Sequence, residues 1–293
     1  MSKSTTPTVS IIIPAYNEAS AIRRCLLAAI NQSSPAEEIV VVNNLSTDET
    51  AEIVRDIQQE FPTAGIRLLE QSAEQGITPT RNYGFDRATG DVLGRIDADS
   101  IIEPGWVEAV RRTFTDPDVA ASTGPVLYHD MPMQKFGFAA DEKIRSTLHR
   151  LARNHRFLFG SNMAIRASAW QKIAALTSHD PEDLMHEDID LALVLYKNDL
   201  EIVYDPTMMA GMSARRLEDS PRDFYNYVMR FERTFKAHGV KSATARIPIF
   251  IYLLIYFPVR TVRKFYDGET NQFTLKKLRD ELIRDKQTIS SDK

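Results

Sequence analysis

The chain has 293 residues, of which 43% are hydrophobic and 26% charged, so it can bury a sizeable core and global disorder is excluded. Its formal net charge of −4 argues against a dedicated nucleic-acid-binding protein and leaves a nucleotide open as a small ligand. The single cysteine, Cys25, excludes a disulfide framework and a cysteine-based metal site, and residues 1–10 lack the apolar segment of a signal peptide, so we expect a cytoplasmic protein.

Apolar runs and helical patterns alternate along the N-terminal third of the chain. Four runs rich in Val, Ile and Leu have the continuous hydrophobicity of buried parallel strands and cover residues 9–17, 37–44, 66–71 and 90–97. Between them, helical spacing and capping residues predict helices at 18–30, 46–61 and 78–88. This alternation predicts an α/β fold with a mostly parallel central sheet flanked by helices.

Polar residues stand where three of these strands end. The first strand ends in PAYNE (14–18), the second in Asn43-Asn44 and the fourth in the segment 97–99, which reads DAD. Ligands of parallel sheets bind at the carboxyl ends of the strands. We therefore expect these polar groups to converge on one binding site.

The middle of the chain carries a second group of predicted elements. They are a strand at 119–129, a strand and helix after a Gly-Ser-Asn turn at 159–170, an amphipathic helix at 186–200 and a strand at 201–206. From residue 220 onward the pattern is helical. No internal repeat or low-complexity segment interrupts this order.

The C-terminal region contains the longest apolar run of the chain, IPIFIYLLIYFPV, at 247–259. The run is shorter than the roughly 20 residues that a membrane-spanning helix needs. Arg246, Arg260, Arg263 and Lys264 flank it, and basic flanks are typical of helices that lie at a membrane surface. A helix packed on the rest of the protein and a homodimer face remain alternatives.

Asp97 and Asp99 are two residues apart, so in extended backbone their carboxylates point to the same side. Two carboxylates at the open edge of a sheet suit a hard divalent cation such as Mg²⁺ or Mn²⁺, with water and phosphate oxygens completing its shell. The alternative is a helix N-terminus, because Ser100 and Pro104 also favour a helix start.

A second acidic group, His186-Glu187-Asp188 with Asp190, opens the helix predicted at 186–200. Acidic residues in a first turn are favoured by the helix dipole. A carboxylate placed there can also act as a general base toward a hydroxyl group. The chain contains no HExxH, GxGxxG or P-loop motif, which argues against a zinc protease, a dinucleotide oxidoreductase and a P-loop NTPase.

Six segments, taken in order, resemble family 2 glycosyltransferases with the GT-A fold. They are IPAYNE (13–18), VVVNNLSTDET (40–50), GITPTRNYG (76–84), GDVLGRIDADS (90–100), FGSNMAIR (159–166) and HEDIDLALVL (186–195). Each motif alone is weak, but six in this order form a specific pattern. The resemblance covers residues 8–218 as a catalytic domain, and residues 219–293 follow as a helical extension that is membrane-associated or dimerising.

The resemblance implies a nucleotide site. Its residues are Pro14, Tyr16, Glu18, Asn43, Asn44, Arg81 and Asp97. Tyr16 would lie near the base and Arg81 near the ribose and diphosphate. Asn43 and Asn44 stand where the family usually has an aspartate pair, which leaves the nucleobase open because an amide both donates and accepts hydrogen bonds.

The resemblance also implies the reacting groups. Asp97 and Asp99 match the DxD motif, so Asp99 would bind Mn²⁺ or Mg²⁺ and Asp97 the ribose or the metal. Asp188 matches the catalytic base, paired with Glu187. Arg215 and Arg216 are predicted to face the departing diphosphate, with plain surface charge as the alternative. The histidine metal ligand of some GT-A enzymes is not evident near these arginines.

Together these residues predict an inverting, metal-dependent glycosyltransferase. Its donor would be a UDP-, GDP- or dTDP-sugar and its acceptor a hydroxyl group, for which a lipid-linked carrier would explain the C-terminal apolar run. The chain lacks the QxxRW motif of processive synthases, which favours transfer of one sugar per event. Cell-surface polysaccharide or glycolipid synthesis in the cytoplasm, at the inner membrane face, would fit.

Two other classes compete with this interpretation. A sugar-phosphate nucleotidyltransferase is also α/β and metal-dependent, but it usually needs a glycine-rich phosphate loop where this chain has PAYNE. A degenerate domain that binds nucleotide sugars or acts as a scaffold is the non-enzymatic alternative. Intact Asp99 and Asp188 argue against it.

Overall fold

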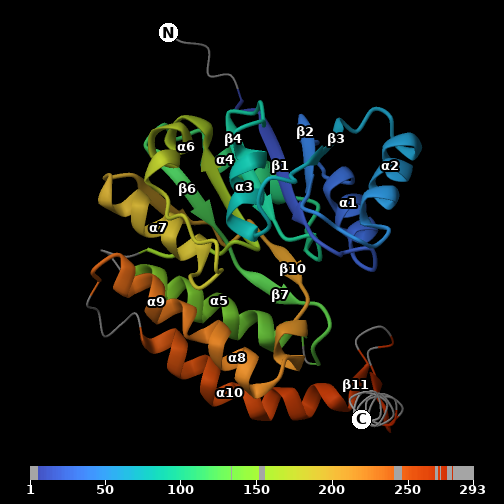
Figure 1. Cartoon of the computed structure of the whole chain (residues 1–293), viewed down its shortest axis with the longest axis vertical. Helices are drawn as coiled ribbons and strands as arrows, with labels where there is room; N and C mark the ends of the chain where they lie inside the picture. Colours follow the sequence, from blue (N-terminus) through green and yellow to red (C-terminus); the bar gives the residue numbers. More distant parts are fainter. Residues whose placement is uncertain are drawn as a thin grey trace.

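A seven-stranded sheet forms the centre of the molecule in the computed structural model, with strands in the order β3-β2-β1-β4-β8-β6-β9 (Figure 1). The structure describes residues 6–132, 134–151, 156–240, 246–267, 270, 272–275 and 279. Strands and helices alternate along the N-terminal third as the apolar runs indicated, which confirms the predicted α/β class.

Four neighbouring strands run parallel. They are β3 (Ile66–Glu70), β2 (Glu38–Asn43), β1 (Val9–Ala15) and β4 (Val92–Ile96). β1 lies in the middle, with Ile11 aligned to Ile39 of β2 and to Gly94 of β4. β1, β2 and β4 are buried along their whole length, which explains their continuous rather than alternating hydrophobicity.

The other half of the sheet is mixed. β8 (Asn162–Arg166) runs antiparallel to both β4 and β6 (Val119–Thr123), and β9 (Glu201–Tyr204) pairs parallel with β6. The sheet is therefore mostly parallel, as predicted, with β8 as the reversed strand.

The strand predicted at 119–129 is in fact two strands. β6 ends before Gly124, and β7 (Val126–Tyr128) joins a small sheet with β10 (Ala210–Met212) and β5 (Ile101–Ile102). A side chain at position 124 would overlap the carbonyl oxygen of Met208, so a glycine is needed where the chain changes sheets.

Helices cover both faces of the central sheet. One face packs against α1 (Ile22–Ile30), α2 (Thr50–Glu60) and α4 (Trp106–Thr113). The other packs against α3 (Ile77–Phe85), α6 (Ala167–Ile173) with the short η1 (Ala174–Leu176), and α7 (Glu187–Lys197). Alternate residues of β1 divide between the two cores: Ile11 and Ile13 face the first, and Ile12 faces the second.

A further group of helices lies below the sheet (Figure 1). It consists of α5 (Gln134–Leu151), η2 (Arg215–Glu218), α8 (Pro221–Val228), α9 (Arg230–Ala237) and α10 (Ile247–Lys264), followed by the hairpin of β11 (Tyr266–Asp267) and β12 (Gln272–Phe273). Within the described residues, no helix is long and apolar enough to cross a bilayer.

The C-terminal helices share a hydrophobic core with α7. Phe231 and Phe235 of α9 pack with Ile189 and Leu193 of α7 and with Phe157. The rings of Phe157 and Phe235 meet edge to face at 6.4 Å. The region beyond residue 218, predicted as an extension, is thus packed directly onto the helix that begins with Glu187.

We expect Phe235→Ala to lower the free energy of unfolding by about 3 to 5 kcal/mol, because it opens a cavity between α9 and α7. Phe250→Ala is the matched control: Phe250 is 67% exposed and its truncation should change that energy by less than about 0.5 kcal/mol. Urea denaturation measures both values. A two-step transition in the Phe235 variant, with α9 melting separately, would contradict a shared core.

Candidate active site

A cavity of about 1010 Å³ opens where β1, β2 and β4 end, and helices α8, α9 and α10 form its far wall. Nine of the residues predicted for nucleotide, metal or catalysis line it: Pro14, Tyr16, Glu18, Asn44, Asp97, Glu187, Asp188, Arg215 and Arg216. The other three, Asn43, Arg81 and Asp99, are not among its lining residues. Segments far apart in sequence therefore meet at one sheet edge, as parallel-sheet topology requires.

The side-chain amide groups of Asn43 and Asn44 donate hydrogen bonds to other groups of the protein. Asn44 Nδ2 donates to the backbone carbonyl oxygens of Gln71 and Glu74 at 2.8 and 2.9 Å, which fixes the loop after β3. Asn43 Nδ2 donates to Glu70 Oε2 at 2.6 Å. Base recognition by these two amides stays a prediction, and it would have to compete with these bonds.

Arg81 lies beneath the cavity instead of in its wall. Its side chain is 0% exposed, and Nη1 donates to the backbone oxygen of Glu187 at 3.0 Å and to the carboxylate Oε2 of the same residue. The role expected from the sequence, contact with the ribose and diphosphate, would require this buried pair to open. In this structure Arg81 supports Glu187.

A second buried arginine, Arg95, extends the buried ion pair of Arg81 and Glu187. Arg95 of β4 places Nη2 2.7 Å from Asp97 Oδ1 and Nη1 3.4 Å from Glu187 Oε1. Glu187 therefore lies between Arg81 and Arg95, and Asp97 lies at the far end. Arg95 was not among the site residues predicted from the sequence, although a charged residue inside the apolar run VLGRI was a usable signal.

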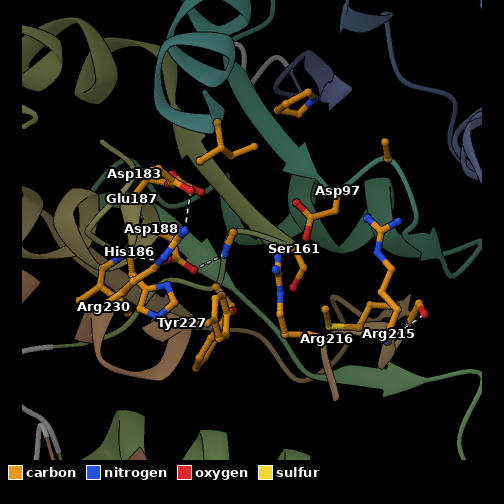
Figure 2. Close-up of a pocket in the computed structure, with 18 of the residues that line it drawn as sticks. Asp97, Ser161, Asp183, His186, Glu187, Asp188, Arg215, Arg216, Tyr227 and Arg230 are labelled. Atoms are coloured by element: carbon orange, nitrogen blue, oxygen red, sulfur yellow. Dashed lines mark hydrogen bonds and ion pairs between the residues drawn. The ribbon is translucent and has the colours of Figure 1, made fainter. Parts of the chain in front are cut away.

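Gly160 makes this arrangement sterically possible. A methyl group at this position would overlap Arg95 Nη1 and come within 2.9 Å of Glu187 Oε1. The Gly160 N–H donates to Asp188 Oδ2 at 2.8 Å, and the Ile189 N–H donates to Oδ1 at 2.9 Å (Figure 2). Gly160 thus leaves space for the Arg95 side chain, and its N–H group also orients the Asp188 carboxylate.

Asp188 stands at the start of α7 with its carboxylate toward the cavity. Burial raises its pKa to about 6, with a smaller rise from Glu187, while the Gly160 hydrogen bond and Arg95 act in the opposite direction. At neutral pH the carboxylate is therefore mostly ionised yet far more basic than a free aspartate, as a general base requires.

Asp99 does not line the cavity itself but contacts Arg215, which does. Arg215 Nε is 3.1 Å from Asp99 Oδ2, and its Nη2 and Nη1 lie 2.5 and 3.0 Å from the Glu18 carboxylate oxygens. Burial, with a smaller effect from Asp97, raises the pKa of Asp99 to about 6 against the opposing effect of Arg215. Negative charge here is thus only partly compensated.

The helix-cap alternative for the two aspartates is wrong. The following helix, α4, begins at Trp106, and no side chain caps it. Asp97 and Asp99 instead sit in the tight turn after β4, where the Ser100 N–H donates to the Asp97 backbone oxygen at 2.9 Å.

The donor set here fits a hard divalent cation. No group of three or more His, Cys, Asp or Glu side chains is clustered for metal binding within the described part of the chain, so protein ligands alone would not complete a shell. Two carboxylates, supplemented by water and phosphate oxygens, are the usual environment of Mg²⁺. The raised pKa of Asp99 marks a negative site that such a cation would stabilise.

The two arginines predicted to face the diphosphate lie side by side but have different partners (Figure 2). Arg215 pairs with Glu18 and Asp99, whereas the Arg216 guanidinium lies over the Tyr227 ring, 4.6 Å from its centroid. Tyr227 belongs to α8, and Tyr252 of α10 also lines this part of the cavity. No local sequence signal marked these tyrosines, because their helices reach the site only through tertiary packing.

Comparison with family models places this chain among glycosyl transferases. The model described as Glycosyl transferase family 2 matches residues 10–174, more than half of the 293 residues. The model described as Glycosyl transferase family group 2 matches residues 95–256.

Curated relatives match part of this chain. Glycosyltransferase AglE of Haloferax volcanii is 39% identical over 127 residues, which are 42% of this chain and 40% of AglE. Chondroitin synthase of Pasteurella multocida is 35% identical over 108 residues, which are 37% of this chain and 11% of that enzyme. The matched region thus spans less than half of the length of either relative.

Solved structures share the fold. The mannosyltransferase PcManGT from Pyrobaculum calidifontis, in complex with GDP-Man and Mn²⁺, superposes with a TM-score of 0.60 at 19% identity, covering 88% of this chain and 74% of that chain. TarS 1-349 of S. aureus, in complex with UDP-GlcNAc, gives 0.56 at 17% identity, covering 86% and 73%. These likenesses show the GT-A fold.

We expect Glu187→Gln to lower the free energy of unfolding by about 3 to 5 kcal/mol, because it leaves the buried charges of Arg81 and Arg95 without their shared partner. Urea denaturation at neutral pH measures the change. Glu182→Gln, an exposed position in the preceding loop, is the control and should change it by less than about 0.5 kcal/mol. Equal, small effects in both variants would show that the buried ion pairs of Glu187 with Arg81 and Arg95 contribute little to stability.

Proposed function

Because this chain belongs to glycosyl transferase family 2, we propose that it is an inverting glycosyltransferase that moves a sugar from a nucleoside diphosphate to an acceptor hydroxyl group. One observation carries this proposal: a single cavity is lined by Asp97 at one end and by Asp188, with its raised pKa, at the other, and Asp99 lies beside the lining residue Arg215 at the Asp97 end. The first end suits a diphosphate with its cation and the second suits a hydroxyl group.

The donor would lie along the carboxyl ends of β1, β2 and β4. The half-exposed ring of Tyr16 offers a stacking surface for the base beside Pro14. Asp99 and Asp97 would hold Mn²⁺ or Mg²⁺, which when bound would stabilise negative charge on the diphosphate. The solved relatives crystallised with GDP-Man and Mn²⁺ or with UDP-GlcNAc support this class of donor, and the nucleobase stays open among uracil, guanine and thymine.

The chemistry would be a direct displacement. Asp188 accepts the proton of the acceptor hydroxyl as its oxygen bonds to the anomeric carbon. The bond from that carbon to the diphosphate oxygen breaks, and the electron pair leaves with the diphosphate, next to Arg215. Attack from the face opposite the leaving group inverts the anomeric configuration, and no covalent intermediate on the enzyme is needed.

The competing functions are less well supported. A nucleotidyltransferase would need phosphate-binding glycines after β1, and PAYNE occupies that position. A scaffold domain without activity would not need a carboxylate whose pKa is raised to about 6 at the cavity wall.

We expect the wild-type protein to release a nucleoside diphosphate from at least one of a panel of UDP-, GDP- and dTDP-sugars with Mn²⁺. The Asp188→Asn variant should lose activity by about 10²- to 10⁴-fold, the usual contribution of a general base. Wild-type kcat/KM should fall about tenfold per pH unit below about pH 6, because the Asp188 carboxylate must be ionised to accept a proton.

Asp99→Ala should abolish the response to Mn²⁺, and Asp118→Asn, in the exposed loop between α4 and β6, is the matched control that should stay fully active. Wild-type turnover in both the Asp99 and Asp188 variants would refute the assignment.

The acceptor would be carried at a membrane surface in cell-surface polysaccharide or glycolipid synthesis. Phe250, Leu254 and Phe257 form a stripe on α10 and are 62 to 67% exposed. The helix contains no acidic residue, and Arg246 at its start is exposed. On its inner side, Ile255 and Val259 line the cavity, so one helix connects the outer apolar stripe with the acceptor end.

We expect the protein to sediment with vesicles containing anionic phospholipid, and the Phe250→Ser/Phe257→Ser variant to bind them at least about tenfold more weakly, because each ring buries apolar area at the interface. Leu176→Ser, in the exposed η1 turn, is the control. A homodimer that the double substitution dissociates, without vesicle binding, would instead identify the stripe as a dimer face.

A further inference from the structure

Arg263, near the end of α10, is a buried charge outside the cavity. The sequence placed it among the basic residues that flank the apolar run 247–259, whereas the structure leaves only 5% of its side chain exposed. It is not among the residues that line the cavity. A guanidinium group buried in this way is not available to a lipid headgroup and needs anionic partners within the protein.

Two carboxylates share the Arg263 guanidinium. Its Nη1 lies 3.1 Å from Asp130 Oδ1, and its Nη2 lies 3.2 Å from Asp130 Oδ2 and 2.8 Å from Glu218 Oε1. Asp130 follows β7, and Glu218 is the last residue of η2. Arg263 therefore ties α10 both to the loop after β7 and to the end of η2.

The Asp130 carboxylate also holds the start of the η2 segment. Ser213 Oγ donates to Asp130 Oδ2 at 2.6 Å, and the Ala214 N–H donates to Oδ1 at 2.9 Å. The Arg215 N–H in turn donates to Ser213 Oγ at 3.1 Å, which closes a tight turn at the first residue of η2. Segment 213–218 is thus anchored at its start through Asp130 and at its end through Glu218, and both anchors bind Arg263.

The anchored segment presents Arg215 to the donor end of the cavity. Figure 2 shows Arg215 on the side of Asp97, away from Asp188. Its Nε lies 3.1 Å from Asp99 Oδ2, and its guanidinium also pairs with Glu18. The Arg215 side chain is 54% exposed, so packing alone does not hold it, and its direction depends on a fixed backbone beneath it.

We propose that Arg263 is a positioning residue for the donor end: by binding Asp130 and Glu218 it fixes segment 213–218 so that Arg215 faces the diphosphate. This inference rests on the proposed glycosyltransferase function, and it gives Arg263 a role in the active site instead of at a membrane surface. Arg263 acts through Arg215, and a displacement of about 1 Å in a group that binds substrate is enough to weaken its contribution strongly.

The first test is a calorimetric titration of the full chain with UDP, GDP and dTDP in the presence of Mn²⁺. Arg215→Gln should weaken binding of the preferred nucleotide about tenfold, as expected for loss of a charged hydrogen bond, and Arg263→Gln about three- to tenfold. In the Arg215→Gln protein, adding Arg263→Gln should change the affinity by less than about twofold, because the effect of Arg263 passes through Arg215.

Arg260→Gln is the matched control. Arg260 lies on the same helix and donates to Tyr256 Oη at 2.8 Å, so its loss removes an arginine contact of α10 without touching Asp130 or Glu218. The nucleotide affinity of this variant should stay within about twofold of the wild type. Asp130→Asn, which removes the charge at nearly constant shape, should weaken nucleotide binding in the same direction as Arg263→Gln and carries the test if that variant does not fold.

The second test is hydrogen–deuterium exchange of the backbone without nucleotide. Arg263→Gln should speed exchange in segment 213–218 at least about tenfold, because the N–H groups of Ala214 and Arg215 lose the anchoring that protects them, and Arg260→Gln should not. Unchanged exchange in this segment, or an equal loss of nucleotide affinity from Arg263→Gln with and without Arg215→Gln, would overturn the inference.

The two measurements also separate this inference from the function on which it rests. A wild-type protein that binds none of the three nucleotides and releases none from a nucleotide sugar would refute the proposed function. Faster exchange in the Arg263→Gln variant of such a protein would still show that Arg263 anchors segment 213–218.

Discussion

The cavity depends on a series of ion pairs in and directly beneath its wall, whose charges compensate one another. Arg81, Glu187, Arg95 and Asp97 alternate in sign, and the first three are almost fully buried. Burying any of these charges alone would be costly, so each fixes the position of the next. This series of ion pairs joins the end of β4 to the start of α7 and so sets the distance between Asp97 and Asp188. Gly160 leaves room for the Arg95 side chain, because a Cβ atom at position 160 would overlap Arg95 Nη1.

This constraint also explains why the C-terminal helices belong to the site. α7 carries Glu187 and Asp188 at its first turn and packs its apolar residues Ile189 and Leu193 against Phe235 of α9. The helix that carries Asp188, the proposed base, is thus held from the opposite side by the region that forms the far wall. The far wall, Asp188 and the outer stripe of α10 are therefore parts of one packed structure.

Asp188 of the cavity wall and Asp99, which contacts the wall residue Arg215, both have pKa values raised to about 6, and burial is the main cause for both. Their surroundings nevertheless differ. Asp99 is next to another carboxylate and shares Arg215 with Glu18, which makes its end receptive to a cation. Asp188 is held by two backbone N–H groups, which leaves it free to take a proton. The same physical effect supports two different tasks because the neighbours differ.

The sequence by itself determined the alternation of strands and helices in the N-terminal half and the mostly parallel sheet, because hydrophobic periodicity is a local property, and it predicted that the polar strand ends at 14–18, 43–44 and 97–99 would converge. It did not reveal that Arg81 is buried or that Arg216 has different partners from Arg215, because side-chain direction depends on which charges meet in space. Nor did it place Tyr227 in the site. Only the tertiary structure decided these points, since ion pairing and the packing of α8 against distant segments are set by contacts between residues far apart in the chain.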